Sequence, residues 1–400
     1  MAKRVVLAYS GGLDTSVAVK WLAQEMGYEV VAMAADVGQG GDFEVIRHRA
    51  LAAGAVAVEV IDARAEFATD FVLPSLFANA LYEDRYPLVS ALSRPVIVSH
   101  LVATAQKYGA TAVAHGCTGK GNDQVRFEVG IRALNPDLEI VAPVRVWGFS
   151  RADSIEYAQK NAIPIMASKD KPYSIDQNLW GRAVECGEME DPWAPPPDDV
   201  YEMTLKTRHE PDELVIAFDQ GVPVSIDGNP MGLVELIDVL NIRLGAFGYG
   251  RIDMVENRRV GIKSREVYEA PAALGLIAAH ADLESLTLER DLAHEKARLS
   301  SRFTELVYDG LWFSPLREAV SEFMAYSQRF VTGEVRLVCE PNRVFVDGRR
   351  SAVSLYDYSL ATYEKEDAFR HSDAEGFVRI WGLGVETWSR SQRSRTSDKS

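Results

Sequence analysis

Residues 5–16 read VVLAYSGGLDTS, and this stretch decides the fold. It begins as an apolar run short enough for a buried strand, breaks at a glycine pair, and resumes with Leu13, Val17 and Trp21 on one face of a helix. A strand that ends in glycines at the start of a helix binds anions, because the first-turn N–H groups lack partners and the helix dipole adds positive potential. The stretch therefore predicts a phosphate-binding loop. Hydroxyl and carboxylate groups stand at the same point, on Ser10, Asp14, Thr15 and Ser16.

Two common phosphate loops do not match residues 10–16. A Walker loop needs a lysine after its glycines, and a dinucleotide fingerprint needs three spaced glycines. The segment SGGLDTS instead resembles the S-G-G-x-D-[ST]-S loop of the ATP pyrophosphatases. In that family the loop holds the β- and γ-phosphates as departing pyrophosphate while the α-phosphate passes to an acceptor. The simpler alternative is an ordinary strand-to-helix turn with a glycine pair.

Composition limits the partners and the compartment. The 400 residues carry a net charge of −15, which argues against a nucleic-acid partner, and basic residues gather only in 390–399, which is predicted to be a disordered tail. Three cysteines without a C-x-x-C pair predict neither a disulfide framework nor a zinc site. No apolar run reaches membrane-spanning length, and the N-terminus has no signal-peptide pattern. We expect a cytoplasmic protein without a membrane partner.

The first part of the chain alternates strands and helices, which predicts an α/β fold with a parallel sheet and ligands at the carboxyl ends of its strands. The expected strands are 4–9, 29–35, 56–61, 111–115 and 138–142. The expected helices are 14–26, 42–54, 64–81, 94–108 and 150–161.

Beyond a proline-rich, extended connection at 190–199 the pattern becomes that of an α+β domain. A last helix near 373–386 carries Phe377, Ile380, Trp381 and Val385, which predicts docking onto a partner or, equally, onto its own domain. We expect three parts: an ATP-binding domain at 1–165, a synthetase or substrate domain at 166–372, and an oligomerisation helix with its tail at 373–400. In the second of these the expected strands are 200–207, 213–218, 222–228 and a hairpin 335–339/343–347, and the expected helices are 231–246 and 271–330.

A second glycine-rich loop follows the strand predicted at 111–115. Residues 115–128 read HGCTGKGNDQVRFE, and three glycines within six positions force an irregular loop. Asp123 and Arg126 together suit a zwitterion, since one can pair with an ammonium and the other with a carboxylate. The alternative is an internal Asp123–Arg126 ion pair at a helix start.

The two loops together resemble the argininosuccinate synthase family. Three further segments agree with that family, namely YEDRYPL at 82–88, YSIDQNLWG at 173–181 and VENRRVGIKSR at 255–265. The resemblance implies an adenine nucleotide alpha hydrolase-like domain and an ATP-dependent ligation of citrulline and aspartate to argininosuccinate, with AMP and pyrophosphate released. It also implies a citrullyl-adenylate intermediate, Mg²⁺ carried with ATP, and a homotetramer held partly by the C-terminal helix.

Site residues are implied by the same resemblance, with no residue acting as a covalent nucleophile. The ATP-binding residues would be Ala8, Tyr9, Ser10, Gly11, Gly12, Leu13, Asp14, Thr15, Ser16, Ala35 and Gly116. The aspartate-binding residues would be Thr118, Asn122 and Asp123, and the citrulline-binding residues Tyr86, Asn122, Arg126, Ser174, Glu256 and Tyr268. On the residues alone, a structural role is favoured for Tyr86, Ser174, Glu256 and Tyr268, namely packing, a turn cap or contacts with Arg258 or Arg259. Cys117 is expected to be incidental, since this route needs no thiol.

Four positions depart from the family pattern. Ala91 and Ala183 stand where a small hydroxyl residue is often found near citrulline, and Ser90 or Ser93 is a possible substitute for the first. Glu266 replaces a glycine and Ala270 a threonine. The rival functions are another ATP-pyrophosphatase ligase, such as a tRNA thiolase, a lysidine-type ligase or an amidotransferase synthetase, and a nucleotide sensor that has lost catalysis.

Overall fold

The computed structural model describes residues 3–164, 173–365 and 367–397. The chain divides into two compact units, Met1–Val353 and Ser354–Ser400. The boundary predicted between residues 165 and 166 lies outside the described residues, so the three-part division stays a prediction.

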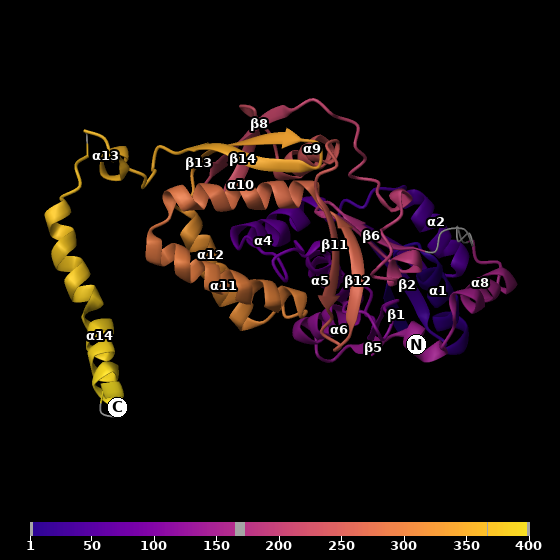
Figure 1. Cartoon of the computed structure of the whole chain (residues 1–400). Coiled ribbons are helices and arrows are strands. Elements are labelled where there is room, and N and C mark those ends of the chain that lie inside the picture. The colour runs from indigo at the N-terminus through magenta and orange to yellow at the C-terminus, as the bar shows by residue number, and fades with distance from the viewer. Residues whose placement is uncertain (1–2, 165–172, 366, 398–400) are drawn as a thin grey trace. The chain divides into compact units, whose positions relative to one another are not determined.

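The first unit begins with a five-stranded parallel sheet in the order β3-β2-β1-β4-β5. Strands β1, β2 and β5 of this sheet are labelled in Figure 1. All five strands were predicted to within one residue at each end, because short apolar runs bounded by turn residues are a local signal. Their bounds are β1 Arg4–Ala8, β2 Glu29–Asp36, β3 Ala57–Asp62, β4 Ala112–Ala114 and β5 Glu139–Val141.

Helices cover both faces of this sheet. Val5 and Leu7 of β1 pack in one apolar cluster with α1, α2 and α8, and Val6 packs in another with α5 and α6. This alternation along β1 is the two-residue period of a strand buried on both faces. The helices are α1 Leu13–Glu25, α2 Phe43–Ala53, α3 Arg64–Glu66, α4 Leu73–Phe77, α5 Val89–Lys107, α6 Asp123–Leu134, α7 Pro143–Trp147 and α8 Arg151–Lys160, with a π-helical stretch Phe67–Val72 between α3 and α4.

Helix α5 begins five residues earlier than the predicted start at Arg94. Pro95 lies inside the observed helix rather than in its first turn. The true start is capped from outside, because the Tyr86 hydroxyl accepts the Ser90 N–H at 2.9 Å. A tyrosine before a helix belongs to no standard capping pattern, so the sequence did not indicate this start.

The rest of the first unit is built on two antiparallel sheets, which confirms the predicted α+β part. One sheet has the order β10-β9-β8-β13-β14 and the other β11-β12-β7-β6. The strands are β6 Ser174–Asn178, β7 Gly181–Glu185, β8 Asp212–Asp219, β9 Val222–Ile226, β10 Asn229–Pro230, β11 Arg251–Asn257, β12 Lys263–Glu269, β13 Gly333–Glu340 and β14 Arg343–Arg350. The helices are α9 Leu233–Gly245, α10 Pro271–Thr287, α11 Arg290–Tyr308 and α12 Pro315–Gln328.

One local prediction in this part was wrong. Residues 200–207, which were expected to be a strand, form none, because the Glu202 and Thr204 N–H groups donate to the buried Glu269 carboxylate at 2.9–3.0 Å instead of to a neighbouring strand. The hairpin of β6 and β7, with its turn at residues 179 and 180, was not predicted.

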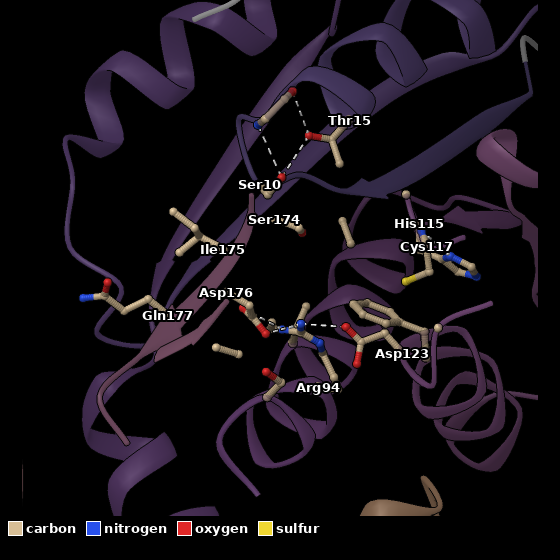
Figure 2. A pocket seen from close by; sticks show the side chains of 18 of the residues that line it. Ser10, Thr15, Arg94, His115, Cys117, Asp123, Ser174, Ile175, Asp176 and Gln177 are labelled. Carbon is tan, nitrogen blue, oxygen red and sulfur yellow. Dashed lines mark hydrogen bonds and ion pairs between the residues drawn. The ribbon is translucent and has the colours of Figure 1, made fainter. Parts of the chain in front are cut away.

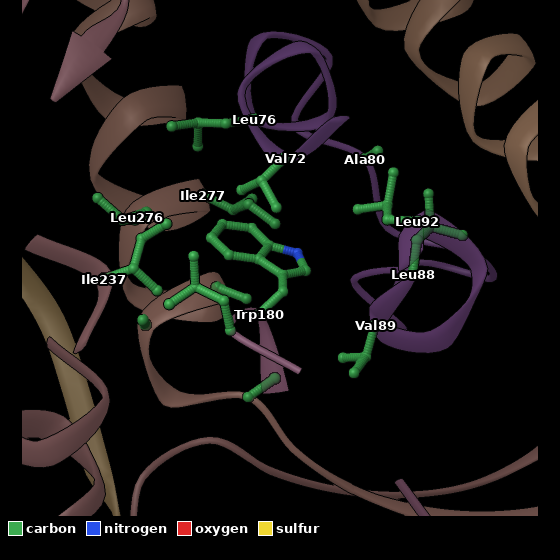
Figure 3. Close-up of a cluster of buried hydrophobic side chains, with 14 of the residues drawn as sticks. Val72, Leu76, Ala80, Leu88, Val89, Leu92, Trp180, Ile237, Leu276 and Ile277 are labelled. Carbon is green, nitrogen blue, oxygen red and sulfur yellow. The ribbon is translucent and has the colours of Figure 1, made fainter. Parts of the chain in front are cut away.

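That hairpin turn joins the two parts of the unit. Trp180 is fully buried among side chains of α4, α5, α9 and α10 (Figure 3), and its indole N–H donates to the Pro87 carbonyl at 2.9 Å. The Asn178 amide donates to the Val89 carbonyl at 2.8 Å, and the Leu179 N–H donates to the Val37 carbonyl at 2.8 Å. The start of α5 and the loop after β2 are therefore held to β6.

The second unit contains α13 Tyr358–Ala361 and the long helix α14 His371–Ser397. The helix continues past Arg390, where a disordered tail was predicted, and Arg390 pairs with Glu386 one turn earlier. Large apolar side chains along α14 are more than half exposed: Phe377, Val378, Ile380, Trp381, Leu383, Val385 and Trp388. No helix in the described ranges is long and apolar enough to cross a membrane.

Candidate active site

The first loop of the site joins β1 to α1. Gly11 has φ +76°, and a Cβ there would lie 3.2 Å from Ile46, so the turn requires glycine. Gly12 is the N-cap of α1 and provides no side-chain cap, and a helix start of this kind attracts an anion. The Ser10 and Thr15 hydroxyls lie 3.1 Å apart at this position (Figure 2).

The second loop follows β4 and passes directly against the first. A Cβ on Gly116 would stand 3.0 Å from the Thr15 methyl, so only glycine allows this approach. His115 is buried, and its Nδ1 accepts the Cys117 N–H at 3.3 Å, which assigns the ring proton to Nε2, 3.4 Å from Glu128. This chain of contacts fixes the loop to α6.

Asp123 opens α6 with two guanidinium groups on its carboxylate. It pairs with Arg126 at 2.9 Å and with Arg94 of α5 at 2.7 Å, and Arg94 also pairs with Asp176 of β6 at 2.5 Å (Figure 2). Burial would raise the pKa of Asp123, but Arg94 and Arg126 outweigh it and hold that pKa well below its usual range. The internal Asp123–Arg126 pair, an alternative left open by the sequence, is formed.

The guanidinium group of Arg126 is only partly hydrogen-bonded. Arg126 is 6% exposed, and its Nε donates to the Tyr308 carbonyl at 3.1 Å. Its Nη2 is buried and has no hydrogen-bond acceptor within the described residues. A buried guanidinium nitrogen without a partner is costly, and a ligand carboxylate would satisfy it.

Aromatic and acidic side chains form another wall of the site. Tyr86 stacks on Tyr268 with ring centroids 4.2 Å apart, and the Tyr268 hydroxyl lies 3.2 Å from Glu256 and 2.7 Å from Glu266. One hydroxyl proton cannot serve both carboxylates at once. Burial, together with the charge of Glu266, raises the pKa of Glu256 well above its usual range, so this carboxyl retains its proton more readily.

These walls enclose one cavity of about 680 Å³, within the range of small-molecule sites. Most of the sequence-predicted residues line it: Ala8, Tyr9, Ser10, Gly12, Leu13, Asp14, Thr15, Ala35, Tyr86, Gly116, Thr118, Asn122, Asp123, Arg126, Ser174, Glu256 and Tyr268. Of the other two, Gly11 packs against Ile46, and Ser16 is 1% exposed with its hydroxyl 2.9 Å from that of Tyr9.

The positions that depart from the family pattern differ in their placement. Ala183 and Glu266 line the cavity, as does Ser90, whereas Ala91 is buried behind it. Ser93 is also buried, and its hydroxyl donates to the Ser90 carbonyl at 3.0 Å. Ser90 is therefore the hydroxyl residue next to Ala91 that reaches the cavity.

Sequence reasoning missed several cavity residues, and most of them have no local motif. Arg94, Asp176, Glu185 and Gln39 reach the cavity from four different elements or loops. Clues existed for three residues, since Asp176 lies in the quoted segment 173–181 and Arg258 and Glu266 lie in or beside the quoted segment 255–265. Arg258 in fact pairs with Glu266 at 2.9 Å and with Glu185 at 2.6 Å, rather than with Glu256 or Tyr268.

The cavity lies at the carboxyl ends of β1, β2 and β4, and it is bounded by an uncapped helix start. This arrangement defines a nucleotide-binding α/β protein. Residues 4–164 match the model of the argininosuccinate synthase N-terminal HUP domain, and residues 173–388 match that of the C-terminal domain of the same family. The chain belongs to the argininosuccinate synthase family.

Family membership confirms the predicted fold class and activity. The chain is a carbon–nitrogen ligase that uses ATP to join citrulline and aspartate into argininosuccinate, releasing AMP and diphosphate. The rival ligases and the sensor are thereby set aside. Within the described residues, no group of three or more His, Cys, Asp or Glu side chains could hold a metal ion.

Proposed function

We propose that this one cavity holds all three substrates, with the residue roles that the family resemblance implies. The observation that carries the proposal is that three segments far apart in the sequence, 8–16, 115–126 and 256–268, line the same cavity. ATP is assigned to the first loop together with Ala35 and Gly116. Aspartate is assigned to Thr118, Asn122 and Asp123. Citrulline is assigned to Tyr86, Asn122, Arg126, Ser174, Glu256 and Tyr268.

The assignment of the β- and γ-phosphates to the first loop has electrostatic support. The amides at the start of α1 attract negative charge, and the Ser10 and Thr15 hydroxyls add donors. A loop without a Walker lysine suits phosphates that leave as pyrophosphate rather than a γ-phosphate that is delivered. We propose that Mg²⁺ arrives on the triphosphate oxygens and there screens their charge.

The amino-acid assignments rest on charge and open donors. The free Nη2 of Arg126 suits the α-carboxylate of citrulline, and Asp123 offers its carboxylate to an ammonium. Asn122 has less freedom, because its amide already donates to the Tyr308 hydroxyl at 2.8 Å and accepts the Arg259 N–H at 2.9 Å. Asn122 therefore has one amide proton and one lone pair of its side-chain oxygen left for a substrate.

The proposed reaction has two steps. The ureido oxygen of citrulline attacks the α-phosphorus of ATP in line, an O–P bond forms, and pyrophosphate leaves. The aspartate amine then attacks the ureido carbon of the citrullyl-adenylate, AMP departs with the ureido oxygen, and the amine loses a proton. The protein positions the reactants and stabilises charge, and no side chain bonds covalently. Burial raises the pKa of the Cys117 thiol, which supports its being incidental.

Oxygen labelling tests this route. Citrulline labelled with ¹⁸O in the ureido group is turned over with ATP and aspartate, and AMP is analysed by mass spectrometry. We expect one labelled oxygen in the AMP phosphate. Unlabelled AMP with label in water or in argininosuccinate would contradict attack by the ureido oxygen.

We further propose a homotetramer held partly by α14, and a cytoplasmic location. The exposed apolar side chains of α14 support the first, because a monomer rarely leaves such a surface uncovered. The three free cysteines support a reducing compartment. The functional division into 1–165, 166–372 and 373–400 is proposed on the same basis as the site roles.

A further inference from the structure

The Gln39 side chain, which lines the cavity, is bound to two backbone groups that a ligand could also bind. Gln39 follows β2, and its amide bonds to two backbone groups at the end of that strand. The Gln39 Nε2 donates to the Ala35 carbonyl at 2.7 Å, and the Val37 N–H donates to the Gln39 Oε1 at 2.7 Å. Because a carbonyl accepts and an N–H donates, the orientation of this amide is fixed by chemistry.

The Ala35 carbonyl and the Val37 N–H lie at the carboxyl end of β2, beside the cavity. Further back along β2, the Met33 carbonyl accepts the Tyr9 N–H at 2.8 Å, so that edge of the strand faces β1. Residues two apart in a strand present their backbone groups to the same side, so the Ala35 carbonyl faces the same way, beyond the end of β1 at Ala8. Ala35 and Val37 both line the cavity.

Adenine has the same hydrogen-bonding pattern as a primary amide. Its 6-amino group is a donor and its adjacent N1 is an acceptor, just as Nε2 and Oε1 are in glutamine. A base seated against the end of β2 would therefore compete with Gln39 for the Ala35 carbonyl and the Val37 N–H.

We propose that Gln39 is a built-in competitor of the adenine base, which ATP must displace from the Ala35 carbonyl and the Val37 N–H. This inference rests on the proposed placement of ATP in the cavity. It makes Gln39 a specificity-determining residue. A base with the reversed pattern, such as hypoxanthine with its N1–H and 6-oxo group, cannot replace the glutamine amide and gains nothing from displacing it.

The loop does not depend on Gln39 for its course. The Gly38 N–H donates to the Asp36 carboxylate at 2.9 Å, and the Val37 carbonyl accepts the Leu179 N–H at 2.8 Å. A Cβ on Gly38 would lie 2.8 Å from the Leu179 backbone, which also fixes this turn. A substitution at Gln39 should thus remove the competitor and leave the loop in place.

The test compares ATP and inosine triphosphate binding to the full-length chain by calorimetry. In Gln39→Met we expect ATP to bind about tenfold more tightly, since two hydrogen bonds no longer have to be broken, while inosine triphosphate changes less than about twofold. Gln24→Met is the matched control, because Gln24 is exposed and its side-chain oxygen accepts the Tyr157 hydroxyl at 3.2 Å, outside the cavity. We expect no change for either nucleotide in the control.

Each other outcome is informative. Weaker or unchanged ATP binding in Gln39→Met, or equal shifts for both nucleotides, would overturn the role of Gln39. A wild-type chain that binds neither nucleotide would instead overturn the placement of ATP. A structure of the wild-type chain with ATP is a second test that needs no variant: the base should replace Gln39 at both backbone groups, and an undisturbed Gln39 would contradict the proposal.

Discussion

Asp123 carries a carboxylate that pairs with two arginine side chains of the site. Its carboxylate neutralises Arg126 and shares Arg94 with Asp176. It therefore has two possible roles, since it can bind the substrate ammonium or it can simply hold two guanidinium groups in place. A matched pair of substitutions separates these roles.

Asp123→Asn should raise the aspartate KM by roughly 30-fold, because a charge-assisted hydrogen bond to the ammonium is lost, and should change the ATP KM by less than about twofold. Steady-state kinetics with each substrate varied measure both constants. Asp176→Asn is the control, since it removes the other carboxylate from Arg94 without touching the proposed aspartate site. Equal effects of the two substitutions would mean that Asp123 only holds Arg94.

Glu266 is the departure from the family pattern with the clearest electrostatic consequence. It faces Glu256 across the Tyr268 hydroxyl, while Arg126 from α6 acts in the opposite sense on Glu256. Because the pKa of Glu256 is raised in the folded chain, the stability that its protonated form contributes is present at low pH and is lost as the pH rises through that raised pKa.

Glu266→Gln should lower the pKa of Glu256 and so move the matching inflection of the citrulline kcat/KM profile to lower pH. The profile of kcat/KM against pH measures this shift. Glu185→Gln is the control, since Glu185 also pairs with Arg258 but lies outside the Tyr268 contact. An unshifted inflection in Glu266→Gln would show that Glu266 does not control Glu256.

At the scale of elements, a buried polar network outside the cavity joins the segment just after α4 to α10, α11 and α12. Glu284 pairs with Lys296 at 3.0 Å and accepts from Asn79 at 2.7 Å and from Gln328 at 2.9 Å, and each of these side chains is buried or partly buried. The amide oxygens of Asn79 and Gln328 therefore point toward the buried His280 ring. They lie 2.6 Å from its Nδ1 and 2.7 Å from its Nε2, respectively. The network fixes how these helices pack.

Lys296→Met should lower the free energy of unfolding by about 3–5 kcal/mol, because it leaves the Glu284 carboxylate buried without a cation. Chemical denaturation at fixed protein concentration measures the change. The double variant Lys296→Met/Glu284→Gln should be more stable than the single variant, since the uncompensated charge is gone. A double variant as unstable as the single would assign the loss to packing alone.

Elements with local signals were predictable from the sequence, and those built by distant contacts were not. The parallel sheet, the hairpin β13–β14 and the two glycine loops each have their pattern within a few residues. The course of 201–207 depends on Glu269, more than sixty residues away along the chain. The start of α5 depends on the Tyr86 hydroxyl, a nearby contact with Ser90 that follows no standard capping pattern. Neither contact could be predicted from local sequence.

The same distinction holds for the candidate site. Glycine and hydroxyl residues of the loops could be found because their spacing is itself the signal. Arg94, Asp176 and Gln39 could not, because each acquires its role only when α5, β6 or the loop after β2 comes to the cavity. The family resemblance supplied the residues of the 256–268 wall, for which a structural contact was the favoured explanation on sequence alone.

At the scale of the whole molecule, the apolar surface of α14 predicts assembly. A chain that ends at Arg370 should have a smaller mass by light scattering than the tetramer expected of the full chain. Trp381→Ser should weaken assembly in the same direction, whereas Trp193→Ser, which alters a 94% exposed tryptophan outside α14, should leave the mass unchanged. Full mass in the truncated chain would refute a role for this helix in assembly.

Pyrophosphate release tests the central claim most directly, namely that one cavity activates citrulline with ATP before aspartate reacts. The assay follows release from ATP with citrulline alone, with aspartate alone, and with both. We predict no release with aspartate alone, a burst that stops near one pyrophosphate per site with citrulline alone, and continuous release with both amino acids. Release that requires aspartate but not citrulline, or continuous turnover with a different acceptor, would contradict the account.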